Sequence, residues 1–117
     1  MIVPTICLYE VFKVVLRKRG EDEALQSIAL MKQGILIELT SEIAILDAKS
    51  SIDHKIPMAD SIILATAQTY EAVIWTEDAD FKGIQGVKYF PKKMRNITHH
   101  SNKYIFSYPF IAIELNT

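Results

Sequence analysis

Residues 57–81 read PMADSIILATAQTYEAVIWTEDADF, and this stretch determines the fold class that we expect. Pro57 suits the start of a helix, which we predict over residues 58–71 with a largely apolar surface. Residues 72–76 form a short apolar run rich in β-branched side chains, and an acidic turn follows at residues 77–81. This second run predicts a buried strand. A helix that leads directly into such a strand is typical of α/β proteins.

The same alternation extends in both directions from this stretch. Glycines end two of the expected helices, and Ser41 has the side chain of a helix N-cap. Short apolar strands that alternate with helices of about ten to fifteen residues predict a parallel sheet flanked by helices. The further elements that we expect are helices from Pro4 to Arg19 and over residues 21–33 and 41–54, and strands over residues 35–39 and 87–90.

Composition and charge exclude several classes of protein. The chain has 117 residues, of which 50% are hydrophobic, and this size is typical of one soluble domain. No apolar run reaches the roughly 18 residues of a membrane span, and residues 1–10 lack the basic start of a signal peptide. Cys7 is the only cysteine, so an internal disulfide and cysteine-rich zinc sites are excluded. We therefore predict a cytoplasmic protein with no membrane partner.

Three acidic side chains are candidates for a catalytic site. Sites in parallel sheets form at the carboxyl ends of strands, where Asp78 follows the expected strand and Asp60 lies in the first turn of the preceding helix. Glu10 lies in the first expected helix among apolar neighbours. If these carboxylates converge without a basic partner, their pKa values rise, and Mg²⁺ or Mn²⁺ removes the repulsion. Such an ion activates water for attack on a phosphodiester.

Each acid also has a simpler interpretation. Asp60 is favourable at a helix N-terminus whatever its function, and Asp78 and Asp80 can shape a turn through hydrogen bonds to the backbone. Glu10 can be a solvated residue of its helix. Spacing along the sequence does not show that the carboxylates converge, so both interpretations remain open at this point.

Three motifs resemble the PIN-domain family. Residues 57–67 contain DSIILATA, which is similar to the family's D-x-[IL]-[IL]-x-A-[TS]-A helix. Residues 73–81 contain TEDADF, which is similar to the T-x-D-x-[DG]-F that follows the next strand, and residues 5–11 match the pattern [ST]-x-x-x-x-E followed by an apolar residue. In this order and spacing the motifs are specific, and the resemblance covers about residues 3–91.

The resemblance implies a fold, an activity and a site. The fold is a three-layer PIN-like domain over residues 1–91, and the activity is a Mg²⁺- or Mn²⁺-dependent endonuclease that cleaves RNA. Many small members are toxins of toxin–antitoxin pairs, so the resemblance also implies an antitoxin partner and a homodimer. Matched residue by residue, the family's catalytic and metal-binding acids fall on Glu10, Asp60 and Asp78, with Asp80 as a further metal neighbour and Thr76 as a supporting hydroxyl.

One departure from the family pattern concerns the start of the chain. Family members begin with a hydrophobic central strand that ends in D-[ST] and supplies the first acid, whereas here Met1 comes just before the helix of Glu10. We therefore expect an N-terminally truncated sheet, unless another segment fills the gap. Residues 92–117 are expected to be a linker and an apolar tail. The apolar run at residues 110–117 could add a strand to the sheet, either within the chain or in a swapped dimer. Such a strand could bring Glu114 toward the acids. An exposed or disordered tail is the simpler interpretation, and we favour it.

Basic residues are concentrated after the acidic turn. Residues 82–103 contain six basic side chains and no acidic one. This segment could contact the phosphate backbone of RNA, and a solvated linker is an equally good interpretation. The candidate RNA contacts are Lys82, Lys92, Lys93 and Arg95.

Two other functions compete with the ribonuclease. A PIN-like chain without activity could serve as a partner-binding module, which the missing first acid favours and the three retained acids oppose. A phospho-receiver domain also clusters acids, but it needs a phosphorylatable Asp at the end of its central strand and a Lys at the end of a later one. The chain shows neither.

Overall fold

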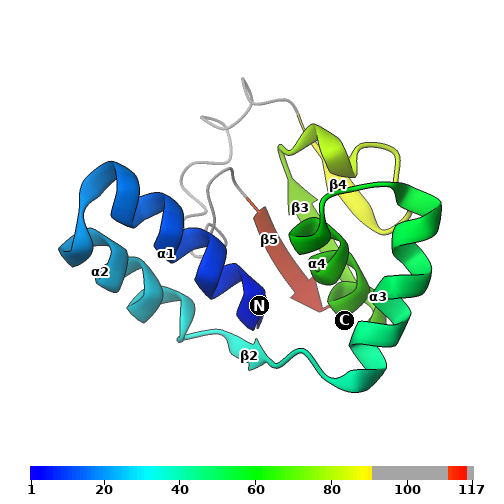
Figure 1. Ribbon diagram of the computed structural model, residues 1–117, viewed down its shortest axis with the longest axis horizontal. Helices are drawn as coiled ribbons and strands as arrows, with labels where there is room; N and C mark the ends of the chain where they lie inside the picture. The colour runs from blue at the N-terminus through cyan, green and yellow to red at the C-terminus, as the bar shows by residue number, and fades with distance from the viewer. Residues whose placement is uncertain (91–110, 116–117) are drawn as a thin grey trace.

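The computed structural model describes residues 1–90 and 111–115 and shows the α/β fold that the sequence predicts (Figure 1). The helices are α1 (Thr5–Arg19), α2 (Glu21–Met31), α3 (Ser41–His54) and α4 (Met58–Thr69), with the short 3₁₀ helix η1 (Ala79–Phe81). The strands are β1 (Ile2–Pro4), β2 (Ile35–Ile37), β3 (Ala72–Thr76), β4 (Val87–Tyr89) and β5 (Ile111–Leu115).

The first residues differ from the expectation. Pro4 ends strand β1 and serves as the N-cap of α1, with φ −60° and ψ 138°, where we expected it to open the helix. The fixed φ of proline suits an extended residue as well as a helix start, so the sequence is compatible with both. The N-cap of α3 is Thr40 and not Ser41, because the Thr40 hydroxyl accepts a hydrogen bond from the Ile43 N–H at 3.2 Å.

Two pairs of strands are parallel, as predicted. β1 pairs with β2, so that Val3 lies opposite Leu36, and β3 pairs with β4, so that Thr76 lies opposite Tyr89. Gly34 directly precedes β2. A Cβ atom at this position would lie 2.9 Å from Val3 Cγ2, which is too close for a normal contact. Glycine therefore allows the backbone before β2 to approach β1 closely enough for the two strands to pair.

The C-terminal apolar run belongs to the sheet, so the exposed tail that we favoured is wrong for residues 111–115. β5 pairs with the second edge of β3, and its direction is antiparallel to β3. It also lies beside β1. The first three residues of β5 are buried, which explains why this run is apolar: Ile111, Ala112 and Ile113.

The direction of β5 places Glu114 away from the predicted acids. Ile111 lies opposite Thr76 at the carboxyl end of β3, whereas Glu114 lies opposite Val73 near its start. Three residues of strand correspond to about 10 Å. Because β5 is antiparallel to β3, its first residue and not its last lies at the carboxyl end of β3. The suggestion that Glu114 approaches the acidic side chains is therefore wrong.

The helices are arranged in two packed pairs. α1 packs along α2, α3 packs along α4, and α1 also contacts α4. Figure 1 shows the two pairs on either side of β5. The core between them includes the fully buried side chains of Val3, Leu64, Ile74, Phe81 and Ile113. Within the described ranges, no helix has both the length and the apolar character needed to cross a membrane.

We predict that β5 stabilises the domain as an internal strand does. Ile113→Ala truncates a side chain that is 0% exposed and should lower the free energy of unfolding by about 2–5 kcal/mol. The same substitution at Ile45, which is 71% exposed on α3, should change it by less than about 1 kcal/mol. Urea unfolding of both variants measures the difference. Equal, small effects would show that residues 111–115 do not pack on β3 in solution.

Candidate metal centre

Asp60 lies in the first turn of α4, where the helix dipole favours a carboxylate. The helix begins after Pro57, whose extended backbone leaves its carbonyl oxygen to accept a hydrogen bond from the Ser61 N–H at 2.9 Å. Asp60 and the buried Ile63 line the same cleft. The start of α4 therefore holds the Asp60 carboxyl group at the wall of a cleft and out of open solvent.

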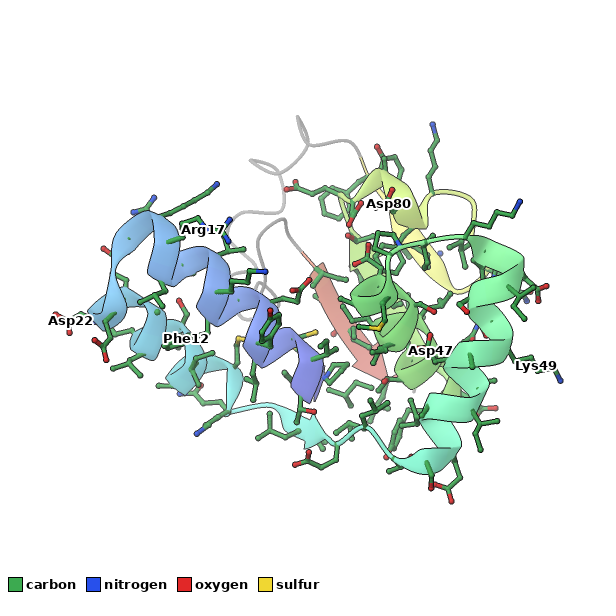
Figure 2. All side chains as sticks on the ribbon, in the orientation of Figure 1. Phe12, Arg17, Asp22, Asp47, Lys49 and Asp80 are labelled. Carbon is green, nitrogen blue, oxygen red and sulfur yellow. The ribbon has the colours of Figure 1, made fainter. Side chains whose placement is uncertain are left out.

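Asp78 and Asp80 are held by the turn that follows β3. The buried Thr76 ends the strand, and its hydroxyl oxygen accepts a hydrogen bond from the Asp78 N–H at 3.0 Å. Asp78 Oδ1 in turn accepts a hydrogen bond from the Asp80 N–H at 2.9 Å, which begins η1. Asp78 thus shapes the turn, as its simpler interpretation predicts, and also lines the cleft. Asp80 is exposed at the edge of this turn (Figure 2).

The three aspartates form a compact group, which we call the aspartate cluster. One carboxylate oxygen from each of Asp60, Asp78 and Asp80 lies within 4.8 Å of the others. Burial, together with the charges of Asp78, Asp80 and Glu10 and a hydrogen bond with Asp78, raises the pKa of Asp60 to about 7. The cluster therefore brings several negative charges close together, and this disfavours the ionised form of Asp60.

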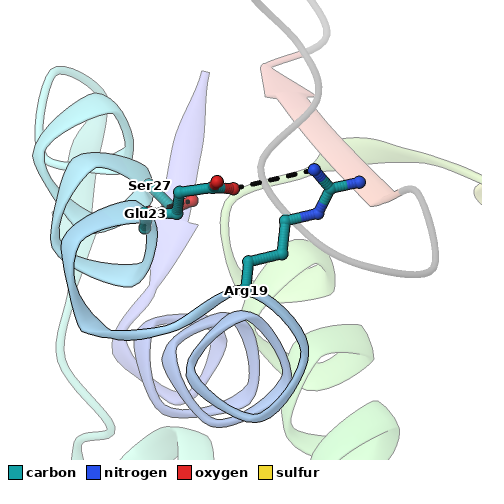
Figure 3. A network of polar contacts seen from close by, with 3 residues as sticks. All are labelled: Arg19, Glu23 and Ser27. Carbon is teal, nitrogen blue, oxygen red and sulfur yellow. Dashed lines mark hydrogen bonds and ion pairs between the residues drawn. The ribbon is translucent and has the colours of Figure 1, made fainter.

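No described basic residue makes an ion pair with the aspartate cluster. An ion pair elsewhere in the described part of the chain joins Arg19 Nη1 to Glu23 Oε2 at 3.7 Å, where α1 is followed by α2 (Figure 3). Ser27 donates a hydrogen bond to the Glu23 carbonyl oxygen at 3.0 Å in the same network. This contact lies in the α1–α2 pair, so the cations of residues 1–90 do not form ion pairs that compensate the charge of the cluster.

Glu10 faces the same cleft from α1. The cleft has a volume of about 240 Å³, and α1 contributes Cys7, Glu10 and Val14 to its lining, opposite Asp60. Glu10 is close enough for its charge to raise the pKa of Asp60, but it lies outside the compact group of three. The structure thus brings together Asp60, Asp78 and Asp80 and places Glu10 across the cleft from them.

The remaining predicted site residues have different positions. Thr76 lines the cleft and is fully buried. Lys82 is exposed just after η1, with its Nζ 5.7 Å from the centroid of the Tyr89 ring. The other three candidate RNA contacts, Lys92, Lys93 and Arg95, lie outside the described residues. Their role stays a prediction.

Six lining residues of the cleft were not singled out as candidates from the sequence, and Cys7 and Ile111 are two of them. Cys7 precedes Glu10 by three positions, so both side chains lie on one face of α1. Burial, together with the charges of Glu10 and Asp60, raises the pKa of the Cys7 thiol above its usual range, so the thiol is protonated. Helical spacing was a usable signal for Cys7. Ile111 enters the cleft through the long-range pairing of β5 with β3, which no local pattern indicates.

The donor set of the aspartate cluster fits a hard divalent cation. Carboxylate oxygens are the ligands that Mg²⁺ and Mn²⁺ prefer, and all three members of the compact group are aspartates. An ion with ligands at about 2.1 Å keeps those ligands roughly 3–4 Å apart, which is close to the spacing of the three carboxylates. A bound cation would also remove the repulsion that raises the pKa of Asp60.

Comparisons with known proteins agree with this geometry. A family model described as the PIN domain matches residues 1–87. A solved structure described as a toxin–antitoxin complex from Klebsiella pneumoniae is similar to this chain, with 27% sequence identity and a TM-score of 0.60. The similarity covers 72% of this chain and 68% of that one. No curated protein sequence matches the chain.

We predict that ionised Asp60 destabilises the cation-free domain. Its pKa of about 7 exceeds the usual aspartate pKa of 3.8, so between these values the folded chain holds a proton that the unfolded chain releases. Stability should therefore fall as the pH rises from about 4 to about 8. Asp60→Asn cannot ionise, and it should be more stable than the wild type at about pH 8 by on the order of 1–3 kcal/mol, after allowance for solvent screening.

The stability difference between Asp60→Asn and the wild type should shrink toward pH 4, where Asp60 is protonated in the folded state and close to half protonated in the unfolded state. Urea unfolding at several pH values measures it. Mn²⁺ should raise the melting temperature of the wild type and have little effect on Asp60→Asn, because a ligand of the folded state stabilises it by mass action. The exposed Asp22 on α2 offers a control, since Asp22→Asn should respond to Mn²⁺ as the wild type does (Figure 2). A pH profile that is the same for both Asn variants would contradict this account of Asp60.

Proposed function

The chain belongs to the PIN-domain family, and from this premise we propose that it is a metal-dependent endoribonuclease that hydrolyses RNA phosphodiesters. PIN domains are generally nucleases that use divalent metals. The observation that carries the proposal for this chain is the aspartate cluster, because its carboxylates converge without an ion-pair partner among the described residues, and Asp60 and Asp78 line the cleft.

The chain's own residues can do three things in the reaction. Asp60, Asp78 and Asp80 would hold Mg²⁺ or Mn²⁺, which when bound lowers the pKa of water and stabilises the charge that develops on a phosphodiester. Glu10, across the cleft, can accept a hydrogen bond from the attacking water and orient it. Thr76 fixes the backbone of Asp78 through its hydroxyl.

The apolar lining of the cleft supports the same chemistry. Val14, Ile63 and Ile111 are wall residues beside the acids, and Ile63 and Ile111 are buried. Apolar walls exclude water and lower the local dielectric constant, so electrostatic interactions between the acids, a cation and a phosphate are stronger there than in open solvent.

We also propose a toxin-like role with an antitoxin partner. The basis is the similar structure from Klebsiella pneumoniae, which is itself described as a toxin–antitoxin complex. A homodimer and a cytoplasmic location complete the proposal, as the family resemblance and the single cysteine suggest.

One observation favours a second function, that of a catalytically impaired partner-binding module. In family members the central strand supplies the first acid. Here β5 lies beside both β1 and β3, and the residue that it brings to the cleft is Ile111. An apolar side chain cannot replace a carboxylate ligand, and loss of a ligand weakens a metal site.

We predict that the chain cleaves RNA in the presence of Mn²⁺ or Mg²⁺ and that a chelator abolishes cleavage. Asp60→Asn and Asp78→Asn should each lower the rate by on the order of a hundredfold, since each removes charge that stabilises the reacting centre. The measurement is the initial rate of cleavage of a fluorescently labelled RNA on denaturing gels. Asp22→Asn, which changes the same charge on α2, should leave the rate within about twofold.

Two results would decide against parts of this proposal. Cleavage that is unchanged in Asp60→Asn would show that the site lies elsewhere. A folded wild-type chain that binds Mn²⁺ but cleaves no RNA would favour the partner-binding module.

A further inference from the structure

The first turn of α4 carries Asp60 and lacks a side-chain cap. Its N-cap residue is Pro57, whose side chain cannot accept a hydrogen bond from the N–H groups that open the helix. α3 begins differently, because the Thr40 hydroxyl accepts a hydrogen bond from the Ile43 N–H. Helix ends without such a cap fray readily, so the position of Asp60 depends on other contacts of its turn.

Ser61, the residue directly after Asp60, makes such a contact. Its side chain is 1% exposed, and its hydroxyl donates a hydrogen bond to Asp47 Oδ1 on α3. Hydrogen bonds to a carboxylate are stronger than those between neutral groups. This bond therefore ties the uncapped turn of α4 to a neighbouring helix whose own start is capped.

The direction of the Ser61 hydroxyl is unusual for a residue within a helix. A helical serine or threonine commonly donates to the carbonyl oxygen four residues earlier, as Thr66 of the same helix does to the Ile62 carbonyl oxygen at 2.8 Å. The Ser61 hydroxyl instead donates to a residue 14 positions away, on another helix. The contact between α3 and α4 thus uses a polar group that could have been satisfied within α4.

Asp47 lies on the face of α3 that packs on α4. It follows the buried Ile43 by four positions, so the two side chains share one face of the helix. Figure 2 shows Asp47 on the side of α3 toward α4 and Lys49 on the far side. Asp47 forms no ion pair within the ranges 1–90 and 111–115, and its carboxylate is directed at Ser61.

The hydrogen bond and the cleft lie on different sides of α4. Asp60 lines the cleft, whereas Ser61 faces α3. Successive residues of a helix are about 100° apart around its axis, so a single turn presents the two side chains in these two directions. Asp47 is not among the charged groups that raise the pKa of Asp60. It therefore acts on Asp60 through the position of the helix and not through its charge.

We propose that Asp47 and Ser61 are positioning residues of the metal centre. Their hydrogen bond fixes the first turn of α4, so that the Asp60 carboxylate stays in place beside Asp78 and Asp80. Partners behind a metal ligand change the affinity for the ion when they are removed, because the ligand must then be ordered at the moment of binding. This inference rests on the proposed metal-dependent function and adds two residues to its site.

The affinity for Mn²⁺ tests the role of this pair. The protein is the full chain, and the electron paramagnetic resonance signal of free Mn²⁺ gives the dissociation constant. Ser61→Ala and Asp47→Ala should each weaken binding about tenfold. The double variant should bind no more weakly than either single variant, since both remove the same bond. Ser61→Thr keeps the hydroxyl and Asp47→Asn keeps an acceptor oxygen, so each should recover most of the affinity.

Hydrogen exchange of the metal-free chain gives a second measurement. The Ser61 N–H donates to the Pro57 carbonyl oxygen at 2.9 Å and reports on the first turn of α4. In Asp47→Ala this N–H should exchange about fivefold faster, while the amides in the second half of α4 keep their rates. Equal acceleration along the whole helix would show a general loss of stability and would contradict a local positioning role.

Thr66→Val is the matched control on the same helix. Thr66 is 2% exposed, and the substitution removes a buried hydroxyl whose hydrogen bond stays within α4. Thr66→Val should lower the melting temperature as Ser61→Ala does, but it should leave the Mn²⁺ dissociation constant within about twofold of the wild type. Asp47 is half-buried, so Asp47→Ala carries the comparison if Ser61→Ala does not fold.

Two results would overturn the positioning role directly. One is an equal loss of Mn²⁺ affinity in Thr66→Val and in the variants of the pair. The other is a double variant in which the losses of Asp47→Ala and Ser61→Ala multiply, because the two residues would then act independently.

Failure of this inference and failure of the proposed function give different results. If the wild-type chain cleaves RNA with Mn²⁺ and the variants of the pair bind Mn²⁺ as the wild type does, the positioning role is wrong and the ribonuclease stands. If these variants lose Mn²⁺ affinity but the wild-type chain cleaves no RNA, the positioning role stands and the ribonuclease is wrong. A wild-type chain that binds no Mn²⁺ would overturn both.

Discussion

Strand β3 is hydrogen-bonded along both of its edges, and the position of the candidate site depends on this pairing. β4 pairs in parallel with residues 74–76 along one edge, and β5 pairs in antiparallel orientation with residues 72–76 along the other, so the carboxyl end of the strand has a neighbour on both sides. The strand ends at the buried Thr76, whose hydroxyl holds the Asp78 N–H. Because β3 is fixed on both sides, the turn that carries Asp78 and Asp80 is presented at a defined edge of the sheet.

The aspartate cluster is electrostatically unfavourable in the absence of a cation. One oxygen from each of three carboxylates lies within 4.8 Å of the others, and burial together with the neighbouring negative charges raises the pKa of Asp60 to about 7. A fold that keeps such a cluster sacrifices stability, since simple replacement of an aspartate by asparagine would relieve the repulsion. A divalent cation converts the same repulsion into binding energy, which gives a physical reason for the cluster that its simpler interpretations as a helix start and a turn do not provide.

Much of the fold follows from local sequence patterns. The apolar helix and strand of residues 57–81 were predicted with almost the observed bounds, because α4 and β3 are long enough for their periodicity to be read. β1 was missed because three residues ending in proline give no clear period. An added strand was considered for residues 110–117 because the run is apolar, and an exposed tail was favoured over it. The pairing partner β3 lies about forty residues earlier in the chain, and the apolar run alone does not indicate that partner.

The sequence predicted the candidate site less completely than it predicted the fold. Asp60, Asp78 and Asp80 could be named from motif spacing and family resemblance, but their convergence needed the register of α4 against β3. Glu10 shares the cleft and stays outside the compact group, because the position of α1 relative to α4 is set by packing and not by spacing along the chain. For the same reason, the sequence did not predict that Ile111 lines the cleft.

The central claim is that the aspartate cluster is a divalent cation site. Crystals of the full chain grown with Mn²⁺ and measured near the manganese absorption edge test it most directly. The account predicts an anomalous difference peak between the carboxylates of Asp60 and Asp78, at about 2 Å from one oxygen of each. Well-ordered carboxylates at this place with no peak between them, or a manganese peak bound only elsewhere in the molecule, would contradict it.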